Sequence, residues 1–304
     1  MTHLTSIVIP CYNQGKFLLE AVESAYAQTH SAIEVIVVND GSTEDLQELE
    51  TAIQARYPSS KFIHQENQGL SAARNTGAKA ASGEFLLFLD ADDKIAPTFV
   101  KKAVEVLMSQ ASVGFVTSYH QTFGTYVETL TYSQSGGLEL YFLDNNNPVS
   151  CVLRHQIWKS LGGFDETMRS GFEDWEFWIR VTGAGWICEV IPEVLFFYRK
   201  HAHSMLYRAD LEKAKIYTYI ITKHRELFSR NIAAFAAASH RYISSLEKQK
   251  IESAAFAKRL TEFAKRLTET NLEQSRKLNK VTGHPLYKVF QFFKRLLAIK
   301  NKTP

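Results

Sequence analysis

Short apolar runs alternate with longer, helix-like stretches over roughly the first hundred residues of the chain. Three runs rich in Val, Ile, Leu and Phe have the length of buried strands: Ser6–Ile9, Glu34–Asn39 and Glu84–Leu89. A weaker candidate strand is Lys61–His64. The intervening stretches have helical length and composition: Phe17–Gln28, Glu44–Arg56 and Leu70–Ala81. Strands that alternate with helices through short connections predict a parallel, doubly wound α/β sheet.

A polar segment follows each of the stronger strands. Pro10-Cys11-Tyr12-Asn13 follows the first, Asp40-Gly41-Ser42 follows the second, and Asp90-Ala91-Asp92-Asp93 follows the third. In doubly wound sheets, ligands bind outside the carboxyl ends of the strands, where the strand order switches. We therefore expect these segments to lie at one edge of the sheet and to line one site.

Three carboxylates crowd into the last of these segments, at Asp90, Asp92 and Asp93. Like charges this close raise one another's pKa unless a cation neutralises them. Because Mg²⁺ and Mn²⁺ take oxygen ligands and bridge carboxylates to phosphates, a metal–diphosphate site is one interpretation. The alternative is a solvated acidic loop that caps a helix starting near Pro97. Asp40 has a similar alternative as an N-cap, but the shared sheet edge favours one joint site.

An acidic pair, Glu173-Asp174, opens the aromatic-rich segment Gly171–Trp178. The pair either caps a helix or supplies a general base in a partly dry pocket. The Trp and Phe side chains nearby would exclude water and would offer rings on which a sugar can stack. Further along, His201 lies among cations in Tyr198–Ser204. Such a group suits a phosphate site, and a basic turn before the tail is the alternative.

The composition changes from about Leu206 onward. Ala, Glu, Lys, Arg and Leu become frequent and proline is absent until Pro285, which predicts long helices. The segment FAKRLTE occurs twice in succession, over Phe256–Glu262 and Phe263–Glu269, and its apolar positions have heptad spacing. Two heptads are short for a coiled coil, so a homodimer seam and an amphipathic helix packed on its own domain are both open.

Charge is distributed unevenly along the chain, although the formal net charge is only +3. Acidic residues outnumber basic ones up to residue 204 and basic residues dominate after it, which predicts two modules with different partners. Over residues 285–300, apolar side chains recur at helical spacing beside Lys and Arg, a pattern that suits an anionic membrane surface. Packing on the acidic part of the chain is the alternative. Nucleic acid is not an expected partner, because no recognition motif accompanies the charge.

Cysteine usage and the N-terminal segment bear on the compartment. The three cysteines are widely spaced and form no CxxC, which argues against a disulfide framework and suits a reducing compartment. The first residues show no basic stretch followed by a long apolar one, so no secretory signal is recognised. We expect a cytoplasmic protein, with the basic tail as a means of peripheral attachment to the inner face of the cell membrane.

Taken in order, six segments of the chain resemble glycosyltransferase family 2, the inverting enzymes of the GT-A fold. They are SIVIPCYNQGKFLLEAVES, VIVVNDGSTED, NQGLSAARNTGAKAASGEFLLFLDADD, GGFDE, GFEDWEFW and YRKHAHSM, between about Ser6 and Met205. DxD tripeptides are common, so the order and spacing of all the segments carry the resemblance. It implies a GT-A domain over residues 1–205, with a Rossmann-like mixed α/β sheet and helices on both faces. A basic, mainly helical extension would follow over residues 206–304.

The resemblance implies a set of donor-binding residues. They are Pro10, Tyr12, Asn13, Asp40, Arg74, Asn75, Asp90, Asp92 and His201. Asp40 would contact the nucleotide base or ribose, and the residues after the first strand would line the same pocket. Arg74 and Asn75 would border the nucleotide. His201 would lie near the diphosphate or the metal.

The resemblance also implies metal ligands and catalytic residues. Asp90 and Asp92 match the DxD motif, and Asp92 would be the principal ligand of Mn²⁺ or Mg²⁺. Asp93 would assist or substitute for it. Asp174 would be the catalytic base, and Glu173 would position the acceptor.

The implied activity is that of an inverting, metal-dependent glycosyltransferase of the hexosyltransferase type. It would move a sugar from a nucleoside-diphosphate sugar, with a UDP-sugar favoured, to a hydroxyl of a glycan or lipid-linked acceptor in cell-surface glycan synthesis. A nucleotidyltransferase is an alternative, disfavoured because no Gly-rich loop follows the first strand. A retaining glycosidase also uses two carboxylates, but it has no use for a metal cluster. The remaining alternative is a nucleotide-sugar-binding scaffold without turnover.

Overall fold

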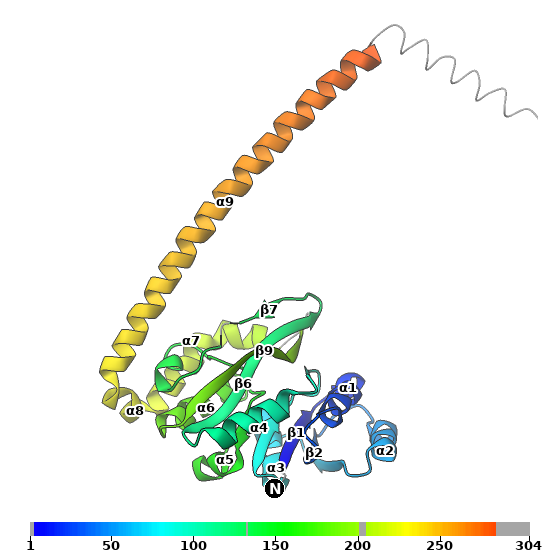
Figure 1. Ribbon diagram of the computed structural model, residues 1–304, viewed down its shortest axis with the longest axis vertical. Helices are drawn as coiled ribbons and strands as arrows, with labels where there is room; N and C mark the ends of the chain where they lie inside the picture. Colours follow the sequence, from blue (N-terminus) through cyan, green and yellow to red (C-terminus); the bar gives the residue numbers. More distant parts are fainter. Residues whose placement is uncertain (1–2, 132, 201–204, 284–304) are drawn as a thin grey trace, which may run out of the picture. The chain divides into compact units, whose positions relative to one another are not determined.

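The computed structural model describes residues 3–131, 133–200 and 205–283, and the chain divides into two units, residues 1–239 and 240–304. The described part of the first unit is built around one mixed sheet of nine strands (Figure 1). The strands are β1 (Thr5–Cys11), β2 (Ile33–Asp40), β3 (Lys61–Gln65), β4 (Phe85–Phe88), β5 (Lys94–Ile95), β6 (Val113–Gly124), β7 (Thr129–Leu130), β8 (Val152–Arg154) and β9 (Ile187–Lys200). Their order is β3-β2-β1-β4-β8-β6-β9-β5, and β7 pairs with β6.

Strands β3, β2, β1 and β4 form the parallel half of the sheet, as the sequence predicts. They are connected by α1 (Gly15–Tyr26), α2 (Gln47–Arg56) and α3 (Leu70–Ala80). Helix α2 begins at Gln47 rather than at the expected Glu44. Glu44 instead accepts a hydrogen bond from the Gly15 N–H at 2.7 Å, and Asp45 accepts one from the Gln47 N–H at 2.9 Å. Each carboxylate thus stabilises the positive end of a helix, Glu44 that of α1 and Asp45 that of α2.

The other half of the sheet contains both strand directions. Strand β8 lies antiparallel between β4 and β6, β9 runs parallel to β6, and the short β5 pairs antiparallel with β9. Register shifts between Val113 and Phe115 and on both sides of Tyr119 mark irregularities in the long β6–β9 pair. The expected α/β class, a mixed sheet with helices on both faces, is confirmed.

Hydrophobic cores fill both faces of the sheet. Along β1, Ile7 and Ile9 belong to one core with α1 and α4 (Phe99–Ser109), whereas Val8 belongs to the other with α3 and α6 (Glu173–Gly183). This alternation buries a parallel strand on both sides. Because both faces are covered, the polar groups of the parallel half are confined to the ends of its strands.

Further helices belong to the first unit. They are η1 (Leu138–Leu140), α5 (His155–Leu161), α7 (Met205–Lys223) and α8 (Arg225–Arg230). Ile216, Ile220 and Phe228 are buried in the same core as Trp175 and Trp178 of α6. Helices α7 and α8 are therefore packed parts of this unit.

The described part of the second unit belongs to α9 (Ile232–Gly283), which contains both FAKRLTE segments. The expected helical C-terminal region is confirmed. Large apolar side chains are exposed along this helix, at Tyr242, Ile243, Leu246, Ile251 and Phe256. Among the described residues, no helix combines the length and the apolar character needed to span a membrane. His201 and residues 285–300, the expected membrane-binding segment, lie outside the described residues.

Candidate active site

Hydrogen bonds join the loops that follow β1 and β2. Asn13 Oδ1 accepts hydrogen bonds from the N–H (2.8 Å) and the hydroxyl (3.1 Å) of Thr43, and the Asn13 N–H donates to Ser42 Oγ at 3.0 Å. Asn13 has a φ of 53°, a left-handed conformation that asparagine adopts more readily than most residues. Tyr12 is 46% exposed, whereas Pro10 is buried within β1. Tyr12 and Asn13 therefore form the accessible surface of this expected base pocket.

Asp40 is buried at the end of β2 and holds the connection between β3 and α3. Its Oδ1 accepts hydrogen bonds from Gln65 Nε2 (2.7 Å) and from the Gln68 N–H (2.9 Å), and its Oδ2 accepts one from the Gly69 N–H (2.9 Å). A carboxylate at the start of a helix is favoured by the helix dipole. In the structure Asp40 thus fixes the loop ahead of α3, and its contact with a nucleotide stays a prediction.

Arg74 links the acidic loop after β4 to the acidic pair that opens α6. Its side chain is almost fully buried; one Nη group donates to Asp90 Oδ1 at 2.7 Å and the other donates to Glu173 Oε1. Burial alone would lower the pKa of Arg74, but the Asp90 and Glu173 carboxylates raise it above its ordinary value. A buried guanidinium is stable only when anions offset its desolvation. Three segments distant in sequence therefore meet at this one cation.

Asn75 has a different environment from its neighbour. Its Nδ2 donates to the Phe164 carbonyl and to Glu166 Oε1, both at 2.9 Å. Its Oδ1 accepts from the Phe164 N–H at 2.9 Å and from Trp158 Nε1 at 3.2 Å. Both donors and both acceptor positions of the amide are used in these bonds, so Asn75 holds the loop that contains GGFDE. Its expected position beside the nucleotide stays a prediction.

The carboxylates of the loop after β4 differ in burial. Asp93 is buried and its Oδ1 accepts a hydrogen bond from the Arg199 N–H at 2.8 Å, whereas Asp90 and Asp92 are partly exposed. Burial, and then the charges of Asp92 and Asp90, raise the pKa of Asp93 well above its usual range. A divalent cation would relieve an excess of negative charge of this kind.

The donor atoms of this loop decide which metal ion it could hold. The described residues contain no group of three or more His, Cys, Asp or Glu side chains arranged to hold a metal. A divalent cation would therefore take one or two carboxylates and complete its shell with oxygen atoms from phosphate and water, as Mg²⁺ commonly does. Asp90 is paired with Arg74, and Asp93 is bonded to a backbone N–H. The choice of Asp92 as the principal ligand stays a prediction. The all-oxygen donor set fits Mn²⁺ or Mg²⁺.

Arg199 supports the acidic loop from β9, a role that the sequence does not predict. Its Nε donates to the Asp92 carbonyl at 2.8 Å, in addition to the bond from its N–H to Asp93. Its guanidinium lies 4.3 Å from the ring centres of both Phe17 and Phe123, within the range of cation–π attraction. Arg199 thus fixes the loop against α1 and β6. The sequence signal for this role is the place of Arg199 in the YRKH segment, shortly after the buried part of β9.

Asp174 lies in the first turn of α6, behind Phe172, whose φ of 59° is in the left-handed region. Asp174 Oδ1 accepts a hydrogen bond from the Trp175 N–H at 2.7 Å, and Oδ2 accepts one from Asn145 Nδ2 at 2.9 Å. Burial, and then the charge of Glu173, raise the pKa of Asp174 to about 7. A carboxylate whose pKa is close to the working pH is suited to act as a general base.

The tryptophans of α6 belong to the core. Trp175 stacks on Tyr217 with ring centres 5.3 Å apart, Trp178 stacks on Phe115 at 4.3 Å, and both tryptophans are fully buried. The expectation that Trp side chains of this segment stack on a sugar is therefore wrong, because protein rings cover them. Their burial does agree with the expected exclusion of water around Asp174.

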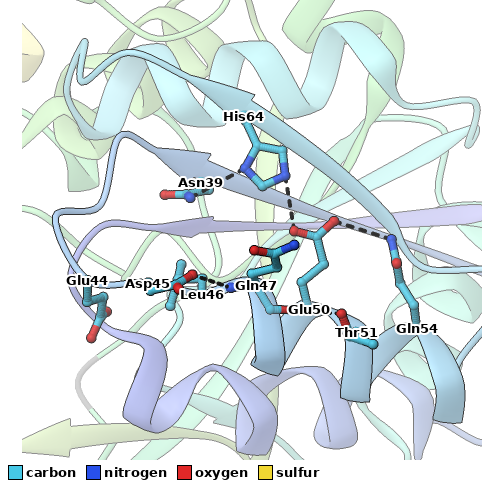
Figure 2. Close-up of a pocket in the computed structure, with 9 residues that line it drawn as sticks. All are labelled: Asn39, Glu44, Asp45, Leu46, Gln47, Glu50, Thr51, Gln54 and His64. Carbon is cyan, nitrogen blue, oxygen red and sulfur yellow. Dashed lines mark hydrogen bonds and ion pairs between the residues drawn. The ribbon is translucent and has the colours of Figure 1, made fainter.

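A polar hollow of about 490 Å³ lies beside α2 (Figure 2). Asn39, Glu50 and His64 face one another there: His64 Nε2 is 3.1 Å from Glu50 Oε2, and His64 Nδ1 is 3.4 Å from Asn39 Nδ2. The hollow reaches the loop after β2, but neither Arg74 nor Asp174 lines it. We therefore assign the candidate site to the groups joined by Arg74.

Comparison with known proteins agrees with this geometry. The family model for glycosyl transferase family 2 matches residues 6–169. An uncharacterized glycosyltransferase of Escherichia coli K12, YibD, is 40% identical over 110 residues, which cover 36% of this chain and 31% of that protein. The glycosyltransferase GlyG of Streptococcus pneumoniae serotype 4 is 33% identical over 178 residues, which cover 58% of this chain and 53% of GlyG. The chain thus matches between about a third and about half of the length of these relatives.

A solved structure shares the fold. The crystal structure of S. aureus TarS 1–349 in complex with UDP-GlcNAc aligns with a TM-score of 0.57 and 21% identity, over 67% of this chain and 60% of that chain. This likeness agrees with the GT-A architecture that the sequence predicts. Because the family model covers more than half of the chain, the conclusion does not depend on any single relative. The chain belongs to glycosyl transferase family 2.

Proposed function

We propose that the chain moves a sugar from a nucleoside-diphosphate sugar to an acceptor hydroxyl, with inversion at the anomeric carbon. One observation carries the proposal: Arg74 joins Asp90, in the acidic loop after β4, to the Glu173-Asp174 pair. A loop suited to a diphosphate and its cation therefore lies next to a carboxylate suited to take a proton. The crystal structures of TarS with UDP and with UDP-GlcNAc support a UDP-sugar as the donor.

On the donor side, we assign the nucleotide to the loops after β1 and β2. Tyr12 offers an exposed ring, and Asn13 and Asp40 fix the loops around it. His201 keeps its proposed place near the diphosphate. Asp92, assisted by its two acidic neighbours, would hold Mn²⁺ or Mg²⁺, which would supply positive charge to the departing diphosphate.

On the acceptor side, we assign the proton transfer to Asp174. Its carboxylate takes the proton of the acceptor hydroxyl, and the freed oxygen forms a bond to the anomeric carbon. The bond from that carbon to the diphosphate oxygen breaks, and its electron pair leaves with the nucleoside diphosphate. A single displacement of this kind inverts the configuration. Glu173, held by Arg74, orients the acceptor for the attack.

A donor screen tests the proposal. The full chain is incubated with UDP- and GDP-sugars, with Mn²⁺ or with a chelator, and released nucleoside diphosphate is measured by mass spectrometry. Release that depends on Mn²⁺ supports a metal-dependent glycosyltransferase. Formation of pyrophosphate from a nucleoside triphosphate and a sugar phosphate would indicate a nucleotidyltransferase instead. Donor binding without any release would indicate a scaffold without turnover.

We also propose a place in the cell for this activity: cell-surface glycan synthesis at the cytoplasmic face of the membrane, on a glycan or lipid-linked acceptor. The bacterial glycosyltransferases among the relatives support it, as does the basic character of residues 206–304. In this view residues 1–205 carry the catalytic groups and residues 285–300 bind anionic lipid. Loss of binding to anionic vesicles on truncation before Pro285 would support the attachment, and unchanged binding would exclude it.

Homodimerisation through α9 is a separate proposal about the same extension. Tyr242, Leu246 and Phe256 are exposed and fall in one heptad frame with the FAKRLTE repeat. Exposed apolar side chains in such a frame are the pattern of a coiled-coil seam. The mass of the full chain in solution decides between a dimer and a monomer.

A further inference from the structure

The segment that follows η1 is firmly fixed beside the start of α6. Trp175 Nε1 donates to the Tyr141 carbonyl at 2.7 Å, and the Tyr217 hydroxyl donates to the Phe142 carbonyl at 2.6 Å. Further along, Asn146 Nδ2 donates to the Gln134 carbonyl at 2.8 Å. The chain on both sides of residue 145 is thus held by bonds to other segments, through backbone carbonyls before it and through the Asn146 side chain after it.

Asn145 uses this fixed position to bond the carboxylate of Asp174. Its Nδ2 donates to Asp174 Oδ2 at 2.9 Å, while Asp174 Oδ1 accepts the Trp175 N–H at 2.7 Å. The two oxygens of the carboxylate therefore have separate donors, and rotation of the group would break both bonds. The bond from the Trp175 N–H comes from the backbone of α6 itself. Asn145 is therefore the side chain from another segment that fixes the orientation of the Asp174 carboxylate.

The oxygen end of the Asn145 amide is left unsatisfied by the part of the chain that the structure describes. Asn145 Oδ1 is buried and accepts no hydrogen bond from any described residue. A buried acceptor without a donor is costly, and such atoms in native proteins call for a physical explanation. A sugar acceptor carries several neighbouring hydroxyls, so one hydroxyl can lose its proton to Asp174 while another donates to Asn145 Oδ1.

We infer that Asn145 is a positioning residue for Asp174 and that its Oδ1 receives a hydrogen bond from a second hydroxyl of the acceptor. The inference rests on the proposed role of Asp174 as the base. Among the described residues, the charged and titratable groups that act on Asp174 include Glu173 on its own helix, Arg74 from α3 and Cys151 beside β8. Asn145 adds a neutral donor to these, and a donor to a carboxylate favours the ionised form.

The sign of the effect follows from that hydrogen bond. In Asn145→Ala the ionised form of Asp174 loses a donor, so its pKa should rise, by about one unit for a bond to a charged group. At pH 7 the ionised fraction would fall about fivefold, and at pH 9 most of it would return. The acceptor KM should rise at every pH because Oδ1 is lost, whereas the donor KM should not change.

A direct titration tests the inference without a known substrate. The full chain is labelled with ¹³C at aspartate carboxyl carbons, and Asp174→Asn assigns the resonance. Asn145→Ala is compared with Asn146→Ala, a neighbouring asparagine whose amide bonds Gln134 instead. We expect the Asp174 titration to move upward by about one pH unit in the first variant only. An unchanged titration in Asn145→Ala overturns the inference.

Further measurements distinguish a variant that does not fold, a failure of the inference about Asn145 and a failure of the base assignment. If Asn145→Ala does not fold, Asn145→Ser replaces it, because a serine hydroxyl is too short to reach the same carboxylate oxygen. Transfer rates with the donor found in the screen should fall at pH 7 and recover by pH 9 in the Asn145 variant. A loss that is equal at both pH values indicates a merely structural role. Full transfer by Asp174→Asn would instead reject the base assignment, whatever the titration of Asn145→Ala shows.

Discussion

Replacement of Arg74 by methionine should be among the most costly single changes in the first unit. Methionine keeps much of the length of the side chain but removes the positive charge and both hydrogen bonds. Asp90 and Glu173, whose side chains are 30% and 7% exposed, would then lie close together without the cation between them. The more buried Glu173 would carry most of the penalty, because Asp90 can regain contact with water.

The size of the penalty can be bounded. Removal of one partner from a buried ion pair costs about 3–5 kcal/mol, chiefly through the charge that is left buried. Since only Glu173 is left strongly desolvated, we expect the lower end, a loss of about 3 kcal/mol in the free energy of unfolding. The double variant with Glu173→Gln removes the stranded charge, so its loss should be smaller than the sum of the two single losses by about 2 kcal/mol.

Urea unfolding followed by tryptophan fluorescence measures these free energies, because Trp175 and Trp178 are buried in the core next to this group. Lys94→Met is the control, since Lys94 and its partner Glu20 form an exposed pair worth at most about 1 kcal/mol. If Arg74→Met loses no more stability than this control, or if the losses in the cycle simply add, Arg74 does not hold the two acidic segments together.

Other predictions concern catalysis, pH, metal and assembly. Asp174→Asn should lower kcat by about 10²- to 10⁴-fold with donor affinity by calorimetry unchanged, and a lost donor affinity would reject its role as base. Asp174 has an ordinary pKa of 3.8 in the unfolded chain and a pKa of about 7 in the folded chain. Between these two pH values the folded chain binds the proton and the unfolded chain does not, so stability falls as the pH rises through this window. The asparagine variant should therefore unfold at higher urea than the parent at pH 8 but not at pH 3; equal shifts at both would contradict the raised pKa. Arg199→Met removes the bond from the side chain to the acidic loop, so the Mn²⁺ concentration for half-maximal donor binding should rise about tenfold. An unchanged Mn²⁺ titration would show that the loop does not need the Arg199 side chain. Leu246→Glu combined with Phe256→Glu should halve the mass measured by light scattering while helicity is kept; a parent chain that is already monomeric would end the dimer proposal.

The position of the candidate site at one edge of the sheet could be predicted, because it follows from the direction of the strands. Strands β2 and β4 both run parallel to β1, so the segments after them necessarily lie at the same edge. Buried strands have a clear apolar pattern, and the polar residues after them stand out. The sequence therefore predicts that Asp40 and the Asp90–Asp93 loop lie at this edge of the sheet, but it does not predict what their side chains contact.

Individual side-chain contacts could not be predicted from the sequence. Arg199 bonds Asp93 across 106 positions, and Asn145 reaches Asp174 from a stretch without periodicity. Neither residue type nor spacing marks such pairs, because loop geometry decides them. Trp175 shows the opposite problem: its segment suggested a ligand platform, but Tyr217 of α7 covers its ring. A helix that is apolar on most sides is buried, and the sequence does not say by which neighbour.

Two arginines hold the acidic loop, one through a carboxylate and the other through a backbone N–H and a backbone carbonyl. Arg199 bonds Asp93 and the Asp92 carbonyl, and Arg74 pairs with Asp90. Bonds from Arg74 and Arg199 therefore fix the loop at three of its groups: the Asp90 and Asp93 carboxylates and the Asp92 carbonyl. Arg74 also lowers the pKa of Asp174, against burial and the charge of Glu173, which raise it. Under the proposed mechanism, Arg74 thus also keeps Asp174 ionisable near neutral pH, so loss of Arg74 should impair donor binding and proton transfer together.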